Sequence, residues 1–250
     1  MQIKVLGTQA PYARFPHNRP GFLITTDSTK IMLDCGNGTT TLINMQEDLK
    51  NLIVIISHLH HDHYGDLGTL INTAYSFRNL KQLSTPLKVY IPASPKERFL
   101  EIIKEEFAFA DYHEIHRNNP LEIGNLTISF LSTVHSQESY AIRITDGKHT
   151  IVYTSDISFA NHLNLIEFAK EADLFICEAS LLREHGFPEI NSHITAYQAA
   201  ILAKEAQVKK LLLTHLWPDE DPKKYLEEAK LTFDNVQLAK EGQIFDFIGM

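Results

Sequence analysis

The stretch Ser57-His58-Leu59-His60-His61-Asp62-His63 places four histidines and one aspartate within six residues, at the end of an apolar run at 52–57. Imidazole nitrogens and carboxylate oxygens are standard ligands of zinc and similar ions. In an extended segment, His58 and His60 project to the same side and can bind one ion. Asp62 and His63 follow where the chain turns and can face a second ion. A histidine-rich surface loop is the alternative, but the position between a strand and a helix favours a metal site.

The chain has 250 residues, of which 44% are hydrophobic and 22% charged, so we expect a single globular domain over 1–250 with a full core. Basic residues number 23 and acidic residues 31, which gives a net charge of −8. That balance disfavours binding to extended nucleic acid, which needs a basic surface. The 13 histidines leave open a local site whose positive charge comes from bound metal.

Cysteine and hydrophobic patterning set further bounds. Cys35 and Cys177 lie in apolar runs and are too few for a disulfide framework or a four-cysteine zinc site, so two buried thiols are expected. Residues 1–7 have a strand pattern without a hydrophobic signal core. No apolar run approaches the length of a transmembrane helix. We therefore expect a cytoplasmic protein without a membrane partner.

The hydrophobic pattern predicts strands that first meander and later alternate with helices. This order indicates sheets that pack together and are covered by helices outside. The segments 236–238 and 243–247 are expected to form a final hairpin that turns at Glu241-Gly242. Strands are predicted at 2–6, 21–26, 30–34, 52–57, 126–131, 140–145, 150–154, 174–177 and 210–214, and helices at 65–79, 95–107, 159–172, 195–207 and 221–231.

Three later segments carry histidine or aspartate just after an apolar run: Thr133-Val134-His135-Ser136, Tyr153-Thr154-Ser155-Asp156 and Leu213-Thr214-His215. Together with the histidine-rich stretch, they resemble the motifs of the metallo-β-lactamase fold hydrolases in their order along the chain. The resemblance covers essentially the whole sequence. It implies an α/β fold, a four-layer αββα sandwich, with the metals at one edge of the paired sheets.

The resemblance also implies a cofactor, namely two divalent metal ions. Zinc is the expected metal, and manganese and iron are alternatives because the same ligands suit them. One ion would be held by His58, His60 and His135, the other by Asp62, His63 and His215, with Asp156 bridging the two.

Other polar residues near these motifs are interpreted separately. Asp34 resembles a position that supports the metal ligands, but a turn aspartate before Gly36 is an equal alternative. His61 lies inside the motif and is not a ligand in the family. The histidines without motif support are expected at the surface or in turns: His17, His113, His116, His149, His162 and His185.

Two such ions imply hydrolysis. A water bound by both ions would have its pKa lowered towards about 7 and would so yield a hydroxide, and the ions would stabilise charge that develops on a phosphoryl or carbonyl oxygen. Asp62 would orient the attacking water or accept its proton. No serine or cysteine nucleophile is required.

The segment 191–196, which contains His193 and Thr195, resembles the His-X-Thr motif of ribonuclease Z and related phosphodiesterases. In that branch the histidine assists departure of the leaving oxygen, which implies a catalytic role for His193. The alternative is a helix N-cap region with Thr195 in the first turn. The protruding arm of tRNA-processing enzymes has no counterpart between His135 and Asp156. Small, cyclic or nucleotide phosphodiesters therefore become the expected substrates.

Alternative functions remain open at this point. The same metals could serve an RNA 3′-processing endonuclease, or a hydrolase of a carbon ester, thioester or lactam. A binding protein that has lost catalysis is a third possibility. Around the site, Tyr12, Arg14 and Trp217 could contact substrate or simply pack beside it.

The helix expected at 65–79 is apolar around much of its circumference, and relatives commonly pair through this helix. A homodimer is therefore expected, although core packing alone would explain the same pattern. The residues concerned are Leu67, Leu70, Ile71, Ala74, Tyr75 and Phe77.

Overall fold

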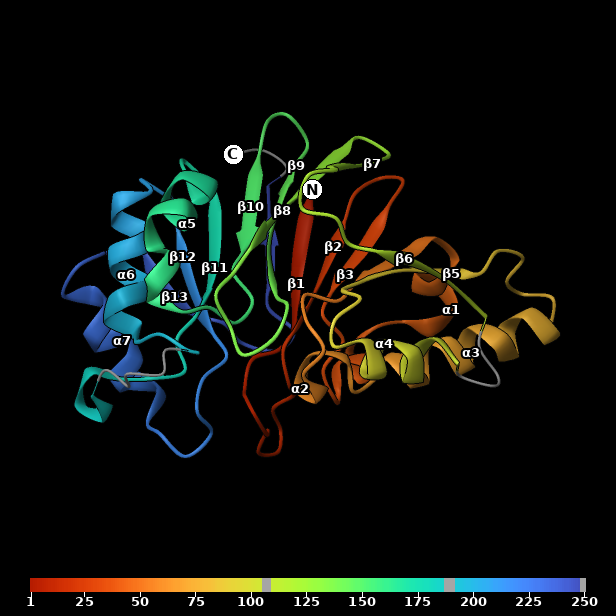
Figure 1. Ribbon diagram of the computed structural model, residues 1–250, viewed down its shortest axis with the longest axis horizontal. Helices are drawn as coiled ribbons and strands as arrows, with labels where there is room; N and C mark the ends of the chain where they lie inside the picture. Colours follow the sequence, from red (N-terminus) through yellow and green to blue (C-terminus); the bar gives the residue numbers. More distant parts are fainter. Residues whose placement is uncertain (105–108, 187–191, 248–250) are drawn as a thin grey trace. The chain divides into compact units, whose positions relative to one another are not determined.

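The computed structural model describes residues 1–104, 109–186 and 192–247, which fall into two compact units (Figure 1). The first unit comprises Met1–Thr8, Tyr12–Ile115 and Lys240–Met250, and the second comprises Gln9–Pro11 and His116–Ala239. Each unit contains one seven-stranded mixed sheet. The expectation of one domain over 1–250 remains a prediction.

The sheet of the first unit combines antiparallel and parallel pairing. Its first four strands in spatial order are paired antiparallel, and the remaining strands continue the sheet in parallel. The spatial order is β14 (Ile244–Asp246), β1 (Gln2–Gly7), β2 (Gly21–Thr25), β3 (Lys30–Leu33), β4 (Leu52–Ile55), β5 (Leu87–Ile91) and β6 (Ala110–Glu114).

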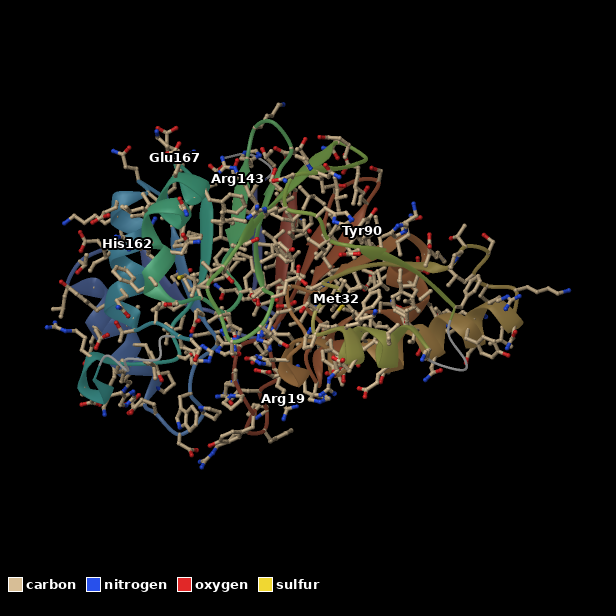
Figure 2. All side chains as sticks on the ribbon, viewed as in Figure 1. Arg19, Met32, Tyr90, Arg143, His162 and Glu167 are labelled. Atoms are coloured by element: carbon tan, nitrogen blue, oxygen red, sulfur yellow. The ribbon has the colours of Figure 1, made fainter. Side chains whose placement is uncertain are left out.

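Helices cover one face of this sheet. The helices are α1 (Met45–Asp48), α2 (His61–Tyr64), α3 (Leu67–Asn79) and α4 (Lys96–Ile103), with short 3₁₀ turns at Thr39–Leu42 and Leu49–Asn51. Leu70 and Ile71 of α3 are almost fully buried and share a core cluster with Met32 and Val89 of the sheet (Met32 is labelled in Figure 2). The apolar face of α3 is therefore used in the core of its own unit.

The second unit has the same sheet design. Its strands β7 to β10 are paired antiparallel, and β10 to β13 are paired in parallel. The spatial order is β13 (Val236–Leu238), β12 (Leu211–Thr214), β11 (Leu174–Glu178), β10 (Thr150–Tyr153), β9 (Tyr140–Thr145), β8 (Leu126–Ser132) and β7 (Leu121–Ile123).

Three helices gather on one side of the parallel strands in Figure 1: α5 (His162–Ala169), α6 (Ala196–Glu205) and α7 (Pro222–Lys230). Short 3₁₀ turns lie at Phe159–Asn161 and Arg183–His185. Ala199, Ala200 and Ala203 of α6 are fully buried in the core cluster that also holds Phe175 and Leu213. Small side chains let a helix approach a sheet closely, which explains why α6 carries alanines at these buried positions.

The expected C-terminal hairpin is wrong. β13 pairs in parallel with β12 in the second unit, whereas β14 pairs antiparallel with β1 in the first unit. The backbone changes its hydrogen-bond partners between β13 and β14. Ala239 N–H donates to the carbonyl of Leu213, whereas Gly242 N–H donates to that of Val5. Each segment thus satisfies its hydrogen bonds against a distant strand and not against its sequence neighbour.

Several element boundaries also differ from the prediction. The helix expected at 65–79 begins at Leu67 and is preceded by the unpredicted α2. The helix expected at 159–172 is a 3₁₀ turn followed by α5, and ends at Ala169. The helix expected at 95–107 is α4 up to Ile103, and residues 105–107 lie outside the described residues. β5, β6 and β7 were not predicted.

The expectation for the cysteines is confirmed. Cys35 and Cys177 are free and fully buried, and burial raises the pKa of both thiols well above the usual value. Asp66 adds to the rise at Cys35, and Glu178 adds to it at Cys177. Among the described residues, no helix is long and apolar enough to cross a membrane.

Candidate metal centre

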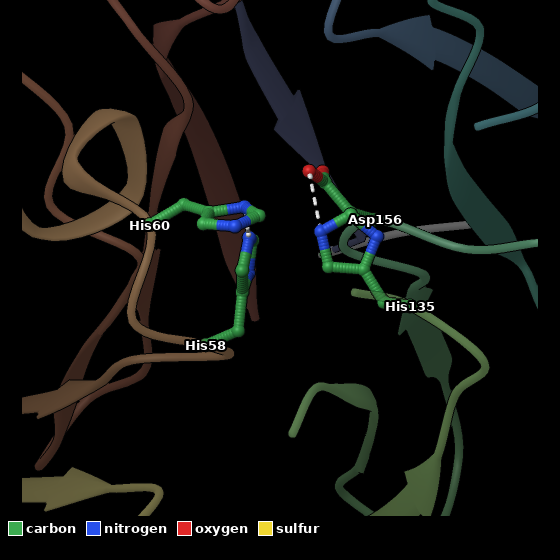
Figure 3. A group of neighbouring side chains, drawn as sticks. All are labelled: His58, His60, His135 and Asp156. Atoms are coloured by element: carbon green, nitrogen blue, oxygen red, sulfur yellow. Dashed lines mark hydrogen bonds and ion pairs between the residues drawn. The ribbon is translucent and has the colours of Figure 1, made fainter. Parts of the chain in front are cut away.

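The histidine-rich stretch of the first unit follows β4 and leads into α2. His58 is fully buried, and its Nε2 lies 3.0 Å from Nδ1 of His60. The two rings meet edge to face in Figure 3, with their centroids 4.7 Å apart. The ring of His63 lies 4.1 Å from that of His58. Three imidazoles therefore gather on one short segment, where their nitrogen atoms can serve as metal ligands.

Asp34 holds this segment in place from the end of β3. Its fully buried carboxylate accepts hydrogen bonds from Ser57 N–H at 2.7 Å and from Ser57 Oγ at 2.8 Å. Its Oδ2 also lies 2.7 Å from Nδ1 of His63. A carboxylate at Nδ1 favours the tautomer that leaves Nε2 available as a ligand atom. Asp34 was interpreted either as a support of the metal ligands or as a turn aspartate, and its contacts with Ser57 and His63 favour the first interpretation.

A close backbone approach explains the glycine after Cys35. A Cβ at Gly36 would overlap the carbonyl oxygen of Asp62, so only glycine allows the turn after β3 to lie against the histidine-rich segment. Cys35 N–H donates to the carbonyl of His63 at 2.7 Å, and Asp66 N–H donates to that of Cys35 at 2.9 Å. These contacts fix the two segments together.

Asp62 and His61 have opposite surroundings within α2. Asp62 is largely buried, with 12% of its side chain exposed, and its Oδ2 lies 3.7 Å from Nε2 of His63. His61 is exposed, and its Nε2 lies 2.9 Å from Nη1 of Arg98. The expectation that His61 is not a metal ligand stays a prediction.

The second unit brings together residues that are far apart in the sequence. Asp156 follows β10, and His215 follows β12. Both strands pair in parallel with β11, which lies between them. Nε2 of His215 lies 3.1 Å from Oδ1 of Asp156, and Nε2 of His135 lies 3.6 Å from Oδ2 (Figure 3). All three side chains are at least 95% buried. Because parallel strands end at a common edge, such residues meet there.

The ring of His193 lies close to the rings of His135 and His215. Its ring centroid is 5.5 Å from that of His135 and 5.3 Å from that of His215, and 31% of its side chain is exposed. The cap of α6 is Thr195, whose hydroxyl accepts from Gln198 N–H while its own N–H donates to the Gln198 side chain. The cap therefore lies two residues after His193, whose side chain is used in other contacts.

Glu178 and Ser180 complete the arrangement, and sequence reasoning missed both. Nδ1 of His193 lies 3.1 Å from each carboxylate oxygen of Glu178, which is almost fully buried. Ser180 Oγ lies 2.7 Å from Oε2 of Glu178 and 2.8 Å from Nδ1 of His215. An available signal was the position of Glu178 at the end of the apolar strand β11, which matches that of Asp156 after β10.

The hydrogen-bond directions in this network follow from the donor inventory. An ionised Glu178 only accepts, so the Ser180 hydroxyl donates to it and accepts from Nδ1–H of His215. That assignment leaves Nε2 of His215 with a lone pair towards Asp156. In the same way, Nδ1–H of His193 donates to Glu178.

The donor chemistry fits a divalent metal. Within the second unit, the imidazoles of His135 and His215 lie beside the buried carboxylate of Asp156, at 3.6 and 3.1 Å. Zinc commonly binds imidazole nitrogens together with a carboxylate oxygen. Nδ1 of His215 is hydrogen-bonded to Ser180, as is usual for a histidine that binds metal through Nε2.

The remaining histidines lie away from these groups. Nitrogen atoms of His17, His113, His149 and His185 lie near the acidic side chains of Glu241, Asp111, Asp146 and Glu220, respectively. His116 is exposed, and His162 stacks on Phe159 near the start of α5 (labelled in Figure 2). Their expected places at the surface or in turns agree with these contacts.

Comparison with known proteins identifies the class. Residues 29–216 match the family model of a beta-lactamase superfamily domain, which is most of the chain. The chain therefore belongs to the beta-lactamase superfamily.

Its relatives refine this assignment. The probable metallo-hydrolase YhfI of Bacillus subtilis is 30% identical over 248 residues, covering 98% of this chain and 100% of that protein. The crystal structure of YhfI, a metallo-beta-lactamase fold protein, has a TM-score of 0.89 and covers 98% of both chains. A ribonuclease Z of Protochlamydia amoebophila is 26% identical over 298 residues, covering 98% of this chain and 96% of that protein.

The fold expected from the sequence, the α/β fold of the metallo-β-lactamases, is thereby confirmed. The chain is a hydrolase of this fold, related to ribonuclease Z, and it carries histidine and aspartate clusters able to bind metal.

Replacing Asp34 tests the support of the histidine-rich segment. In metal-free protein, Asp34→Ala should lower the free energy of unfolding by about 2 to 3 kcal/mol, because the buried donors on Ser57 and His63 lose their acceptor. Asp34→Asn should cost less, since asparagine tolerates the left-handed backbone (φ 55°). Urea denaturation measures both. The exposed Asp27→Ala is the control, and equal stability of all three variants would contradict the assigned role.

Proposed function

We propose that this hydrolase is a metal-dependent phosphodiesterase acting on small, cyclic or nucleotide phosphodiesters. The observation that carries the proposal is the position of His193, which lies beside two candidate metal ligands with its Nδ1 on the buried carboxylate of Glu178. A phosphodiester is favoured over a carbon ester, thioester or lactam because the segment that carries His193 and Thr195 resembles the His-X-Thr motif of ribonuclease Z and related phosphodiesterases.

Two divalent ions, with zinc as the expected metal, would be held by the ligands that the family motifs assign. Bound ions would supply a water of lowered pKa and would stabilise negative charge on the phosphoryl oxygens. The residues that would hold them are His58, His60, Asp62, His63, His135, Asp156 and His215.

His193 would act as the proton donor to the leaving oxygen. Because Nδ1–H donates to Glu178, Nε2 is the nitrogen that can carry the transferred proton. The ionised carboxylate stabilises the positive imidazolium before transfer and holds the ring in one orientation. The partial exposure of the side chain gives a substrate access to it.

Asp62 would act on the attacking water. Its carboxylate lies beside His63 in the first unit and is mostly protected from solvent. A carboxylate in such a place can orient a water or accept its proton. Asp34, by contrast, has both oxygens occupied by Ser57 and His63 and serves to position the ligand.

Processing of RNA 3′ ends is the alternative that the ribonuclease Z relative brings. The alignment with that enzyme runs over 298 positions, more than the 250 residues of this chain, so the enzyme carries segments that this chain lacks. Between His135 and Asp156 the chain forms only β9, a turn and β10. This compact connection and the net charge of −8 favour a small substrate.

Two further proposals concern the state of the protein. We retain a cytoplasmic location and a homodimer formed through α3. Leu67, Leu70, Ile71 and Ala74 face the core, so a partner would contact the partly exposed Tyr75 and Phe77.

A substrate panel tests the reaction class. The zinc-loaded protein should hydrolyse bis-p-nitrophenyl phosphate and a cyclic nucleotide, and a chelator should abolish both activities. A thioester, a β-lactam and a precursor tRNA are the comparison substrates. Faster hydrolysis of any of these three, or no phosphodiester hydrolysis in protein that holds zinc, would overturn the proposal.

Removal of His193 tests its role as proton donor. His193→Ala should lower kcat for a phosphodiester with a poor leaving group by about 100-fold or more, because general acid catalysis is lost. Substrates with a nitrophenolate leaving group should be affected less, since that group needs no proton. Metal content should stay close to that of the unaltered protein. His162→Ala is the matched control, and unchanged turnover in His193→Ala would disprove the role.

A further inference from the structure

The only tryptophan of the chain, Trp217, follows the candidate ligand His215 by two residues. Its neighbour Leu216 is 6% exposed, whereas Trp217 is 42% exposed. A large aromatic side chain contributes much to a core when it is buried, and its exposure beside a functional group is typical of a recognition surface.

The backbone of Trp217 is held firmly. Leu216 forms a parallel bridge with Gln9, and its carbonyl accepts from Ala10 N–H at 3.2 Å. The carbonyl of Trp217 accepts from Glu220 N–H at 3.3 Å. The indole is therefore presented on a fixed frame, which reduces the entropy that a ligand must overcome.

Tyr225 links this frame to the metal centre. Its hydroxyl is buried, contacts the Trp217 backbone and donates to the carbonyl of Ser180 at 3.4 Å. Burial raises the pKa of Tyr225 to about 12, so the hydroxyl stays protonated and both contacts persist. Ser180 also binds Nδ1 of His215. The position of the indole and that of the ligand are thus set by one network.

A second exposed apolar side chain, that of Val134, directly precedes the candidate ligand His135 in the sequence. His135, His193 and His215 follow one another at ring distances of 5.5 and 5.3 Å. Val134 directly precedes His135 and is 47% exposed, and its carbonyl accepts from Ser158 N–H at 2.8 Å. Each of the candidate ligands His135 and His215 therefore has an exposed apolar residue within two positions in the sequence.

The charges after Trp217 restrict the kind of ligand. Asp219, Glu220 and Asp221 follow it after Pro218. A long polyanion would be repelled here, because binding to a phosphate backbone needs basic side chains. A ligand with one phosphodiester and an aromatic base avoids that repulsion and can use the indole face.

We propose that Trp217 is a stacking platform for the nucleobase of a nucleotide phosphodiester. This inference rests on the proposed function for the phosphodiester group and adds the chemical class of its substituent. Base stacking on aromatic side chains is tolerant of base identity, so we expect recognition of nucleotides in general and not of one base.

Fluorescence tests the stacking directly, because Trp217 is the sole tryptophan. Titration of the zinc-loaded protein with adenosine 5′-monophosphate should quench the emission. The affinity should be at least about tenfold higher than that for ribose 5-phosphate, which lacks the base. By calorimetry, Trp217→Ala should lose this preference and Trp217→Phe should keep most of it. Leu163→Ala, at an exposed apolar residue of α5, is the control.

Equal affinity of the unaltered protein for the two ligands, or a preference that survives in Trp217→Ala, would overturn the inference. Hydrolysis of bis-p-nitrophenyl phosphate separates this failure from failure of the proposed function. If that ester is cleaved without any base preference, only the stacking role falls. If the base preference is present but no phosphodiester is cleaved, the proposed function falls and the nucleotide-binding surface stands.

Discussion

Parallel strands that end at a common edge determine where the functional side chains of each unit lie. Asp34 follows β3 and Ser57 follows β4 in the first sheet, and Asp156, Glu178 and His215 stand at the ends of β10, β11 and β12 in the second. A strand fixes its end residue rigidly, since both neighbours bind it along its length. Groups that are distant in sequence can therefore meet without a long ordered loop.

The backbone at these strand ends is strained. Asp34, Ser155 and His215 have φ values of 55°, 54° and 59°, which side-chain-bearing residues rarely adopt. Such a conformation costs of order 1 to 3 kcal/mol and persists where the surroundings impose it. Here it accompanies a sharp turn out of the sheet that places Asp34, Asp156 and His215 in their contacts.

One design recurs in both units. A buried carboxylate at a strand end binds Nδ1 of a histidine: Asp34 binds His63 in the first unit, and Glu178 binds His193 in the second. In each case a serine hydroxyl completes the carboxylate shell. We assign different roles to the two histidines, because His63 is fully buried whereas the His193 side chain is 31% exposed. The first would hold a metal, and the second would reach the substrate.

The sequence predicted much of this and missed what depends on distant pairing. The order of histidines and aspartates along the chain predicted the fold, because it resembles the motifs of the metallo-β-lactamase fold hydrolases. Glu178 and Ser180 carry no motif, and their roles arise only when β11 lies between β10 and β12. β6 is polar and only partly buried, so hydrophobic alternation gave no signal. The prediction of a C-terminal hairpin was wrong because the residues of a turn do not indicate which distant strand each flanking segment pairs with.

Metal stoichiometry tests the central claim most directly, namely that the assigned histidines and aspartates form a two-metal centre. Protein stripped with a chelator, reloaded with zinc and freed of excess ion should retain two ions per chain by elemental analysis. Asp156→Ala should reduce that number, whereas His162→Ala should not. Retention of no zinc by the unaltered protein, or full retention by Asp156→Ala, would contradict the account.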